Sequence, residues 1–105
     1  MKREYFSSFH ISDFEFYEGV LVFEKLRIGE LIKLKTDKKN TFDKYAVEIY
    51  YKESKLGYIP HAESKQIAKL LNVGYNCFEA RIQWINKDSY PAGQIGIIVY
   101  LLENK

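Results

Sequence analysis

Residues 45–60 read YAVEIYYKESKLGYIP, a pattern that predicts a β-hairpin. Segment 45–51 is dense in the β-branched and aromatic residues that are favoured in strands. The polar residues 52–54 form the expected turn, and residues 56–59 form the returning strand. Pro60 ends that strand, because proline has no N–H to donate to a neighbouring strand.

Further strand-like patterns lie on both sides of this hairpin. In residues 30–35 the side chains alternate in character, as in a half-buried strand. Strands are also expected over residues 7–14, 78–85 and 95–102, with a loop over residues 86–93.

Residues 61–73 change to a helical period. Ile67, Leu70 and Leu71 fall on one helical face, and Gly74 stands where a left-handed residue ends many helices. We therefore expect a mainly β fold with one main helix. Its natural form is an antiparallel sheet curled into a small β-barrel that the helix plugs.

The composition predicts one domain over residues 1–105, of which 47% are hydrophobic and 29% charged. Nine Tyr, seven Phe and one Trp are too many aromatic residues for a disordered tail. The formal net charge is only +2, so any nucleic-acid binding has to be local and shape-specific.

The single cysteine, Cys77, excludes an internal disulfide and argues for a reducing compartment. With two histidines, the chain also lacks the usual ligands of a structural zinc site. We expect no signal peptide, because polar residues interrupt the N-terminal segment, and no membrane span, because no run of about 20 apolar residues occurs in the sequence. We expect a cytoplasmic monomer without a metal, a cofactor or a membrane partner.

Positive charge is concentrated in residues 37–70, which carry seven lysines against five carboxylates. Phe42, Tyr45 and Tyr58 are interleaved with these lysines. Lysines that hold phosphates and aromatic rings that stack on bases are typical of single-strand binding. An ordinary solvated surface is the alternative interpretation.

Four motifs occur in order along the chain: GELIKL at 29–34, NTFDKYAVEI at 40–49, LGYIP at 56–60 and IAKLL at 67–71. Together with the aromatic pair Phe16-Tyr17, they resemble the HIRAN domain over about residues 9–102. The resemblance implies a modified OB-like fold with a helical insertion. The best-understood members of the family bind the 3′-hydroxyl end of single-stranded DNA, and the resemblance implies the same activity for this chain.

The same resemblance implies a pocket for the terminal nucleotide. Asp43, an acceptor when ionised, would bind the terminal hydroxyl and repel a 3′-phosphate. Asn40 matches a position that contacts the terminal nucleotide. Phe16 and Phe42 match aromatic positions against the last bases, and Tyr17 belongs either to this platform or to the core.

Further positions match the path of the DNA backbone. The resemblance places Tyr58 and His61 near the backbone phosphate. Lys39 and Lys65, with Lys38, would steer the strand in a salt-dependent way.

Each of these residues also has a purely structural interpretation. Asp43 fits a turn cap, and Asn40 fits a left-handed backbone position. Phe16 and Phe42 fit a hydrophobic core, and His61 fits an ordinary surface position near the start of the helix.

Some positions depart from the family pattern. Glu15 stands where the DNA-binding members carry a basic residue, and His61 stands for a lysine. Phe16 and Phe42 lack the hydroxyl of the tyrosines found at those places. These differences predict weaker binding or altered specificity.

We do not expect an enzyme, because Asp37, Asp43 and Glu48 form no recognisable set of metal ligands and no nucleophilic triad or phosphate loop is present. Two functions stay open. One is a DNA-binding module that works with a helicase or nuclease. The other is a protein-interaction module that recruits a repair, replication or defence partner through the Glu15 side.

Overall fold

The computed structural model describes residues 2–89 and 95–103, which form six strands and several short helical segments. In chain order, with η for a 3-10 turn, they are β1 (Arg3–His10), η1 (Phe14–Phe16), α1 (Gly19–Val22), η2 (Phe23–Lys25), β2 (Leu31–Thr36), β3 (Val47–Tyr51), β4 (Ser54–Tyr58), α2 (His61–Asn72), β5 (Phe78–Ile85), η3 (Lys87–Ser89) and β6 (Ile95–Leu102).

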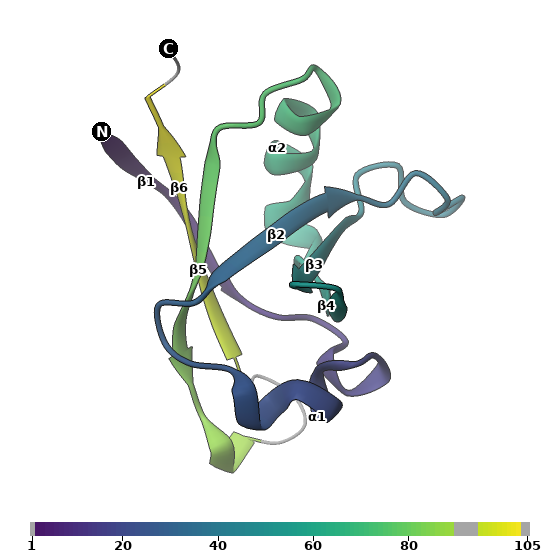
Figure 1. Ribbon diagram of the computed structural model, residues 1–105. Coiled ribbons are helices and arrows are strands. Elements are labelled where there is room, and N and C mark those ends of the chain that lie inside the picture. The colour runs from purple at the N-terminus through teal and green to yellow at the C-terminus, as the bar shows by residue number, and fades with distance from the viewer. Residues whose placement is uncertain (1, 90–94, 104–105) are drawn as a thin grey trace.

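The strands form one antiparallel sheet in the order β1-β6-β5-β2-β3-β4 (Figure 1). The predicted mainly β fold with one main helix is confirmed. The sheet is not closed, in contrast to the expected barrel: among the described residues, only a bridge between Ser12 and Tyr58 links its two ends. That pairing stops because Asp13 adopts a left-handed conformation (φ 63°) and begins the turn into η1.

One face of the sheet encloses the core together with α2, which lies beside β2 and β3 (Figure 1). Ile67 and Ala68 of α2 are fully buried, as are Val47 and Ile49 of β3. Side chains that alternate with these, such as Glu48, point to the outer face of the sheet.

The helix predicted over residues 61–73 is confirmed as α2. Its end has the expected left-handed glycine, because Gly74 has φ 92° and its N–H donates to the carbonyl oxygen of Leu71. The next N–H, of Tyr75, donates to the carbonyl oxygen of Leu70. These bonds satisfy carbonyl groups that the helix itself leaves open.

The predicted hairpin is confirmed as β3 and β4, with a turn at Lys52 (φ 54°). Gly57 of β4 has φ 147°, and a Cβ there would overlap the carbonyl oxygen of Ser12. Glycine is therefore needed where the segment that follows β1 crosses β4.

The N-terminal strand, expected over residues 7–14, begins earlier and ends earlier, at Arg3–His10. Its first three residues pair with the last three of β6, a contact that local pattern does not reveal. The strands expected at 78–85 and 95–102 have the predicted bounds. Part of the loop expected between them, residues 90–93, lies outside the described residues.

Candidate nucleic-acid interface

The loop between β2 and β3 is held in shape by its own polar groups. Asn40 Oδ1 accepts hydrogen bonds from the N–H groups of Phe42 and Asp43, both at 2.9 Å. Asn40 thus makes an Asx-type turn, and its own backbone is not in the left-handed conformation that the structural interpretation required. Among the described non-glycine residues, positive φ occurs only at Asp13 and Lys52.

The two phenylalanines predicted as stacking platforms lie on the surface. Phe42 is fully exposed (101%), and Phe16, at the end of η1, is 73% exposed. The alternative interpretation, that these two rings belong to the hydrophobic core, is therefore wrong. Both rings are therefore accessible for stacking against a base.

Asp43 contacts both its own loop and the start of α2. Its Oδ1 accepts a hydrogen bond from the N–H of Tyr45 at 2.9 Å, so it does cap a turn. Its Oδ2 lies 3.3 Å from Nδ1 of His61, and the two side chains are 29% and 87% exposed. One carboxylate oxygen is thus used by the fold, and the other faces an exposed histidine.

Two lysines flank Tyr45 next to this carboxylate. The Nζ atoms of Lys44 and Lys65 lie 5.1 and 5.4 Å from the centre of the Tyr45 ring, within range of a cation–π attraction. Lys39 is exposed in the preceding part of the loop, where its N–H donates to Asp37 Oδ1. The loop therefore carries positive charge on both sides of Phe42.

The turn that holds Phe16 and Tyr17 is anchored on β4. Glu18 Oε1 accepts the N–H of Lys55, and the Glu18 N–H donates to the Lys55 carbonyl oxygen, both at 2.9 Å. Tyr17 packs edge-on against Tyr58 with ring centres 5.7 Å apart. Lys55 Nζ lies 4.3 Å from the centre of each of these two rings.

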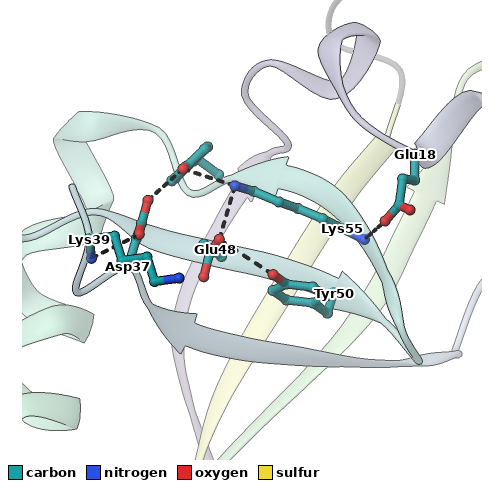
Figure 2. Close-up of polar contacts among 7 residues, drawn as sticks. Glu18, Asp37, Lys39, Glu48, Tyr50 and Lys55 are labelled. Atoms are coloured by element: carbon teal, nitrogen blue, oxygen red, sulfur yellow. Dashed lines mark hydrogen bonds and ion pairs between the residues drawn. The ribbon is translucent and has the colours of Figure 1, made fainter.

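A chain of polar contacts links the hairpin of β3 and β4 to the loop between β2 and β3 (Figure 2). The Tyr58 hydroxyl donates to Asp37 Oδ2 at 2.6 Å and accepts from Lys55 Nζ at 2.9 Å. Lys55 also forms an ion pair with Glu48 at 2.9 Å, and the Tyr50 hydroxyl donates to the same carboxylate. Asp37 in turn accepts the backbone N–H of Lys39 (Figure 2).

The protonation states in this network follow from burial and from these bonds. Burial, together with the hydrogen bond to Asp37, raises the pKa of Tyr58 to about 12. Burial opposes the charge of Lys55, but hydrogen bonds to Tyr58 and Glu48 outweigh it and raise the pKa of Lys55 above its ordinary value. At neutral pH, Tyr58 is therefore neutral and Lys55 is charged.

The predicted residues fall into two groups. One lies on the loop and α2 and comprises Lys39, Asn40, Phe42, Asp43, His61 and Lys65. The other is the set of Phe16, Tyr17 and Tyr58 on η1 and β4. Asp37 joins them, because it bonds the Tyr58 hydroxyl and its carbonyl oxygen accepts the Asn40 N–H.

Sequence reasoning missed Lys55 and Asp37 as members of the site. Within the described residues, the hydrogen bonds and ring contacts of the Tyr58 side chain are with Lys55, Asp37 and Tyr17, and no hydrogen bond joins it to Asp43 or His61. A hairpin register would have placed Glu48 opposite Tyr58 and hence near Lys55. No local signal points to Asp37.

Within residues 2–89 and 95–103, no group of three or more His, Cys, Asp or Glu side chains is arranged to hold a metal ion. Over the same ranges, each helix is too short or too polar to cross a membrane.

Comparisons with known proteins extend these observations. No curated protein sequence matches the chain. A crystal structure of a protein from Lactobacillus plantarum has a TM-score of 0.82 at 17% identity and covers 98% of both chains. The HIRAN domain of human HLTF has a TM-score of 0.72 at 17% identity, with 94% of this chain and 78% of that chain covered. At such identity, both likenesses describe the fold. The HIRAN domain family model matches residues 5–101, nearly the whole chain, and the protein therefore belongs to the HIRAN domain family.

Proposed function

We propose that this protein is a non-catalytic module that binds single-stranded DNA at its 3′-hydroxyl end. HIRAN domains are DNA-binding modules, so membership of the family supports nucleic-acid binding in general. The preference for a single strand, the recognition of its end and the residues involved are the further content of the proposal.

The observation that carries the proposal is the exposed ring of Phe42 on a fixed loop. Burial of a phenylalanine side chain is worth about 1.5–3 kcal/mol, and this ring gains none of it in the free protein. The two bonds to Asn40 Oδ1 hold the backbone below the ring. A base that stacks on it therefore meets an aromatic surface that is already in place.

The chemistry of a free 3′ end matches the remaining groups of the loop. Asn40 Nδ2 forms no hydrogen bond with the described part of the chain, so it can donate to a base edge or a phosphate. The outer oxygen of Asp43 can accept a hydroxyl proton, and its charge would repel a terminal phosphate. Lys44 and Lys65 beside Tyr45 would contact the preceding phosphate.

The test compares one 5′-labelled single-stranded oligonucleotide with a 3′-hydroxyl and with a 3′-phosphate, by fluorescence anisotropy. We expect tighter binding of the hydroxyl form. Asp43→Asn keeps an oxygen that can accept the Tyr45 N–H but removes the charge, so the preference should shrink while the fold is retained. Asp88→Asn, the same change at an exposed residue of η3, is the matched control.

Equal binding of both ends by the wild-type protein would refute end recognition. Absence of binding to either oligonucleotide would favour the alternative, a protein-interaction module, in which Glu15 and His61 have weakened the DNA site. The helicase or nuclease partner, the monomeric state and the cytoplasmic location stay predictions from the sequence.

A further inference from the structure

The outer face of β2 and β3 carries a second concentration of positive charge. Lys33 and Lys35 are exposed on one side of β2, about 7 Å apart because they are two residues apart on an extended strand. In the sheet register, Lys33 lies opposite Tyr50 and Lys35 lies opposite Glu48. Lys52, in the turn after β3, is also exposed.

Two depressions run along this face. One, of about 460 Å³, is lined by residues that include Lys35, Lys38, Lys39 and Tyr50. The other, of about 480 Å³, shares Lys35 and Tyr50 and continues to Lys33 and Lys52. The two depressions are adjacent, because Lys35 and Tyr50 line both, and we call them together the lysine groove.

Two of the three carboxylates that line the lysine groove, Glu48 and Asp37, are held by other partners. Glu48 is paired with Lys55, and Asp37 accepts the Tyr58 hydroxyl. No ion pair of the lysines that line the groove occurs within the described residues. Counted with Lys55, this face carries six lysines (residues 33, 35, 38, 39, 52 and 55) and three carboxylates (residues 37, 48 and 53). Its net charge is therefore +3, which exceeds the net +2 of the whole chain.

The lysine groove is continuous with the candidate interface. Lys38 and Lys39, at one end of it, directly precede Asn40 in the loop. Asp37, also in its lining, bonds Tyr58, which packs on Tyr17. A DNA strand whose last nucleotide lies at the loop can therefore continue along the outer face of β2 and β3.

We propose that the lysine groove binds the phosphate backbone of single-stranded DNA on the 5′ side of the terminal nucleotides, with Tyr50 as a surface for one base or sugar. A row of lysines that follows a backbone beside an aromatic ring is a common way to bind single strands. The end assignment of this inference rests on the proposed function, but Lys33, Lys35 and Lys52 of the groove lie outside the candidate interface.

The experiment measures the salt dependence of binding to oligothymidylates of four and twelve nucleotides, both 5′-labelled and 3′-hydroxyl. Each phosphate neutralised on a single strand adds about 0.7 to the slope of log affinity against log salt. Three contacts in the groove therefore add about 2 to the slope for the longer strand. Between about 50 and 200 mM salt, its affinity should fall roughly 20-fold more than that of the shorter one.

The test variant combines Lys33→Gln, Lys35→Gln and Lys52→Asn. Asparagine is chosen at residue 52 because it tolerates the positive φ there. We expect the twelve-nucleotide strand to lose its extra slope in this variant, while four-nucleotide binding is retained. A control with Lys2, Lys25 and Lys87 each changed to Gln removes the same charge from exposed sites on other elements and should leave the extra slope intact.

Three outcomes overturn the groove: equal slopes for both lengths in the wild type, an unchanged extra slope in the groove variant, or the same loss in the control. A comparison of the affinities for 3′-hydroxyl and 3′-phosphate strands tests the proposed function separately. If the wild type ignores the 3′ end but keeps an extra slope that the groove variant loses, the groove stands and end recognition fails.

Discussion

Replacing Phe42 by alanine should weaken DNA binding without disturbing the fold. The ring is 101% exposed, so its loss removes no buried apolar surface. The backbone N–H groups of residues 42 and 43 donate to Asn40 Oδ1, and the substitution keeps these two hydrogen bonds. We expect the free energy of unfolding to change by less than about 0.5 kcal/mol.

The effect on binding follows from the stacking it removes. Stacking of one base on an aromatic ring is worth about 1–3 kcal/mol, and about 1.4 kcal/mol changes Kd tenfold. Phe42→Ala should therefore raise Kd by about 5- to 140-fold. Phe42→Tyr keeps the ring, and binding should be retained.

Fluorescence anisotropy with a 5′-labelled, 3′-hydroxyl oligonucleotide at fixed salt measures these Kd values, and urea unfolding measures stability. Tyr5→Ala is the control, since it removes an aromatic ring that is 59% exposed on β1, outside the candidate interface. An unchanged Kd for Phe42→Ala, or an equal loss in the control, would refute the role of this ring.

Three further predictions concern stability. Tyr58→Phe should cost about 0.5–1.5 kcal/mol at pH 8 by urea unfolding. Since burial and a hydrogen bond to a carboxylate raise the pKa of Tyr58 to about 12, this contribution should fade as the pH rises from about 10 through 12. Gly57→Ala should cost about 2 kcal/mol or more and lower Tm by roughly 8 °C or more, because of its positive φ and the overlap with Ser12; an unchanged thermal melt would contradict this. The hydrogen bond from Arg81 lowers the pKa of Glu79. The ionised Glu79 side chain therefore stabilises the fold above the ordinary glutamate pKa of about 4.3, and this contribution is lost as the pH falls below that value. Glu79→Gln should therefore lower Tm slightly at pH 7, with a smaller difference at pH 3.

Local pattern was sufficient for the elements whose contacts are close in sequence. The hairpin of β3 and β4 follows from two runs of strand-forming residues around a short polar turn. Helix α2 follows from its 3.6-residue period and from Gly74 at its end. The ordered motifs around residues 40–60 were also sufficient to identify the family, which the family match confirms.

Closure of the sheet could not be predicted in this way. Strand alternation shows which side chains share a face, but it does not say where a sheet stops. In the part of the chain that the structure describes, the two ends of the sheet meet at one bridge, because the left-handed turn at Asp13 takes the chain into η1. The early start of β1 has a similar cause, because its partners in β6 lie almost a full chain length away.

The candidate interface divides along the same line. Asn40, Phe42 and Asp43 lie within four residues, and their short-range bonds reflect the loop sequence itself. The contact of Asp37 with Tyr58 spans 21 residues and exists only because β2, β3 and β4 pair in this register. The exposure of Phe42 also needed the tertiary structure, because an aromatic residue in a sequence carries no mark of whether the core has room for it. Residue types and short spacings therefore follow from the chain, whereas long-range pairing decides which of those residues meet and which stay in solvent.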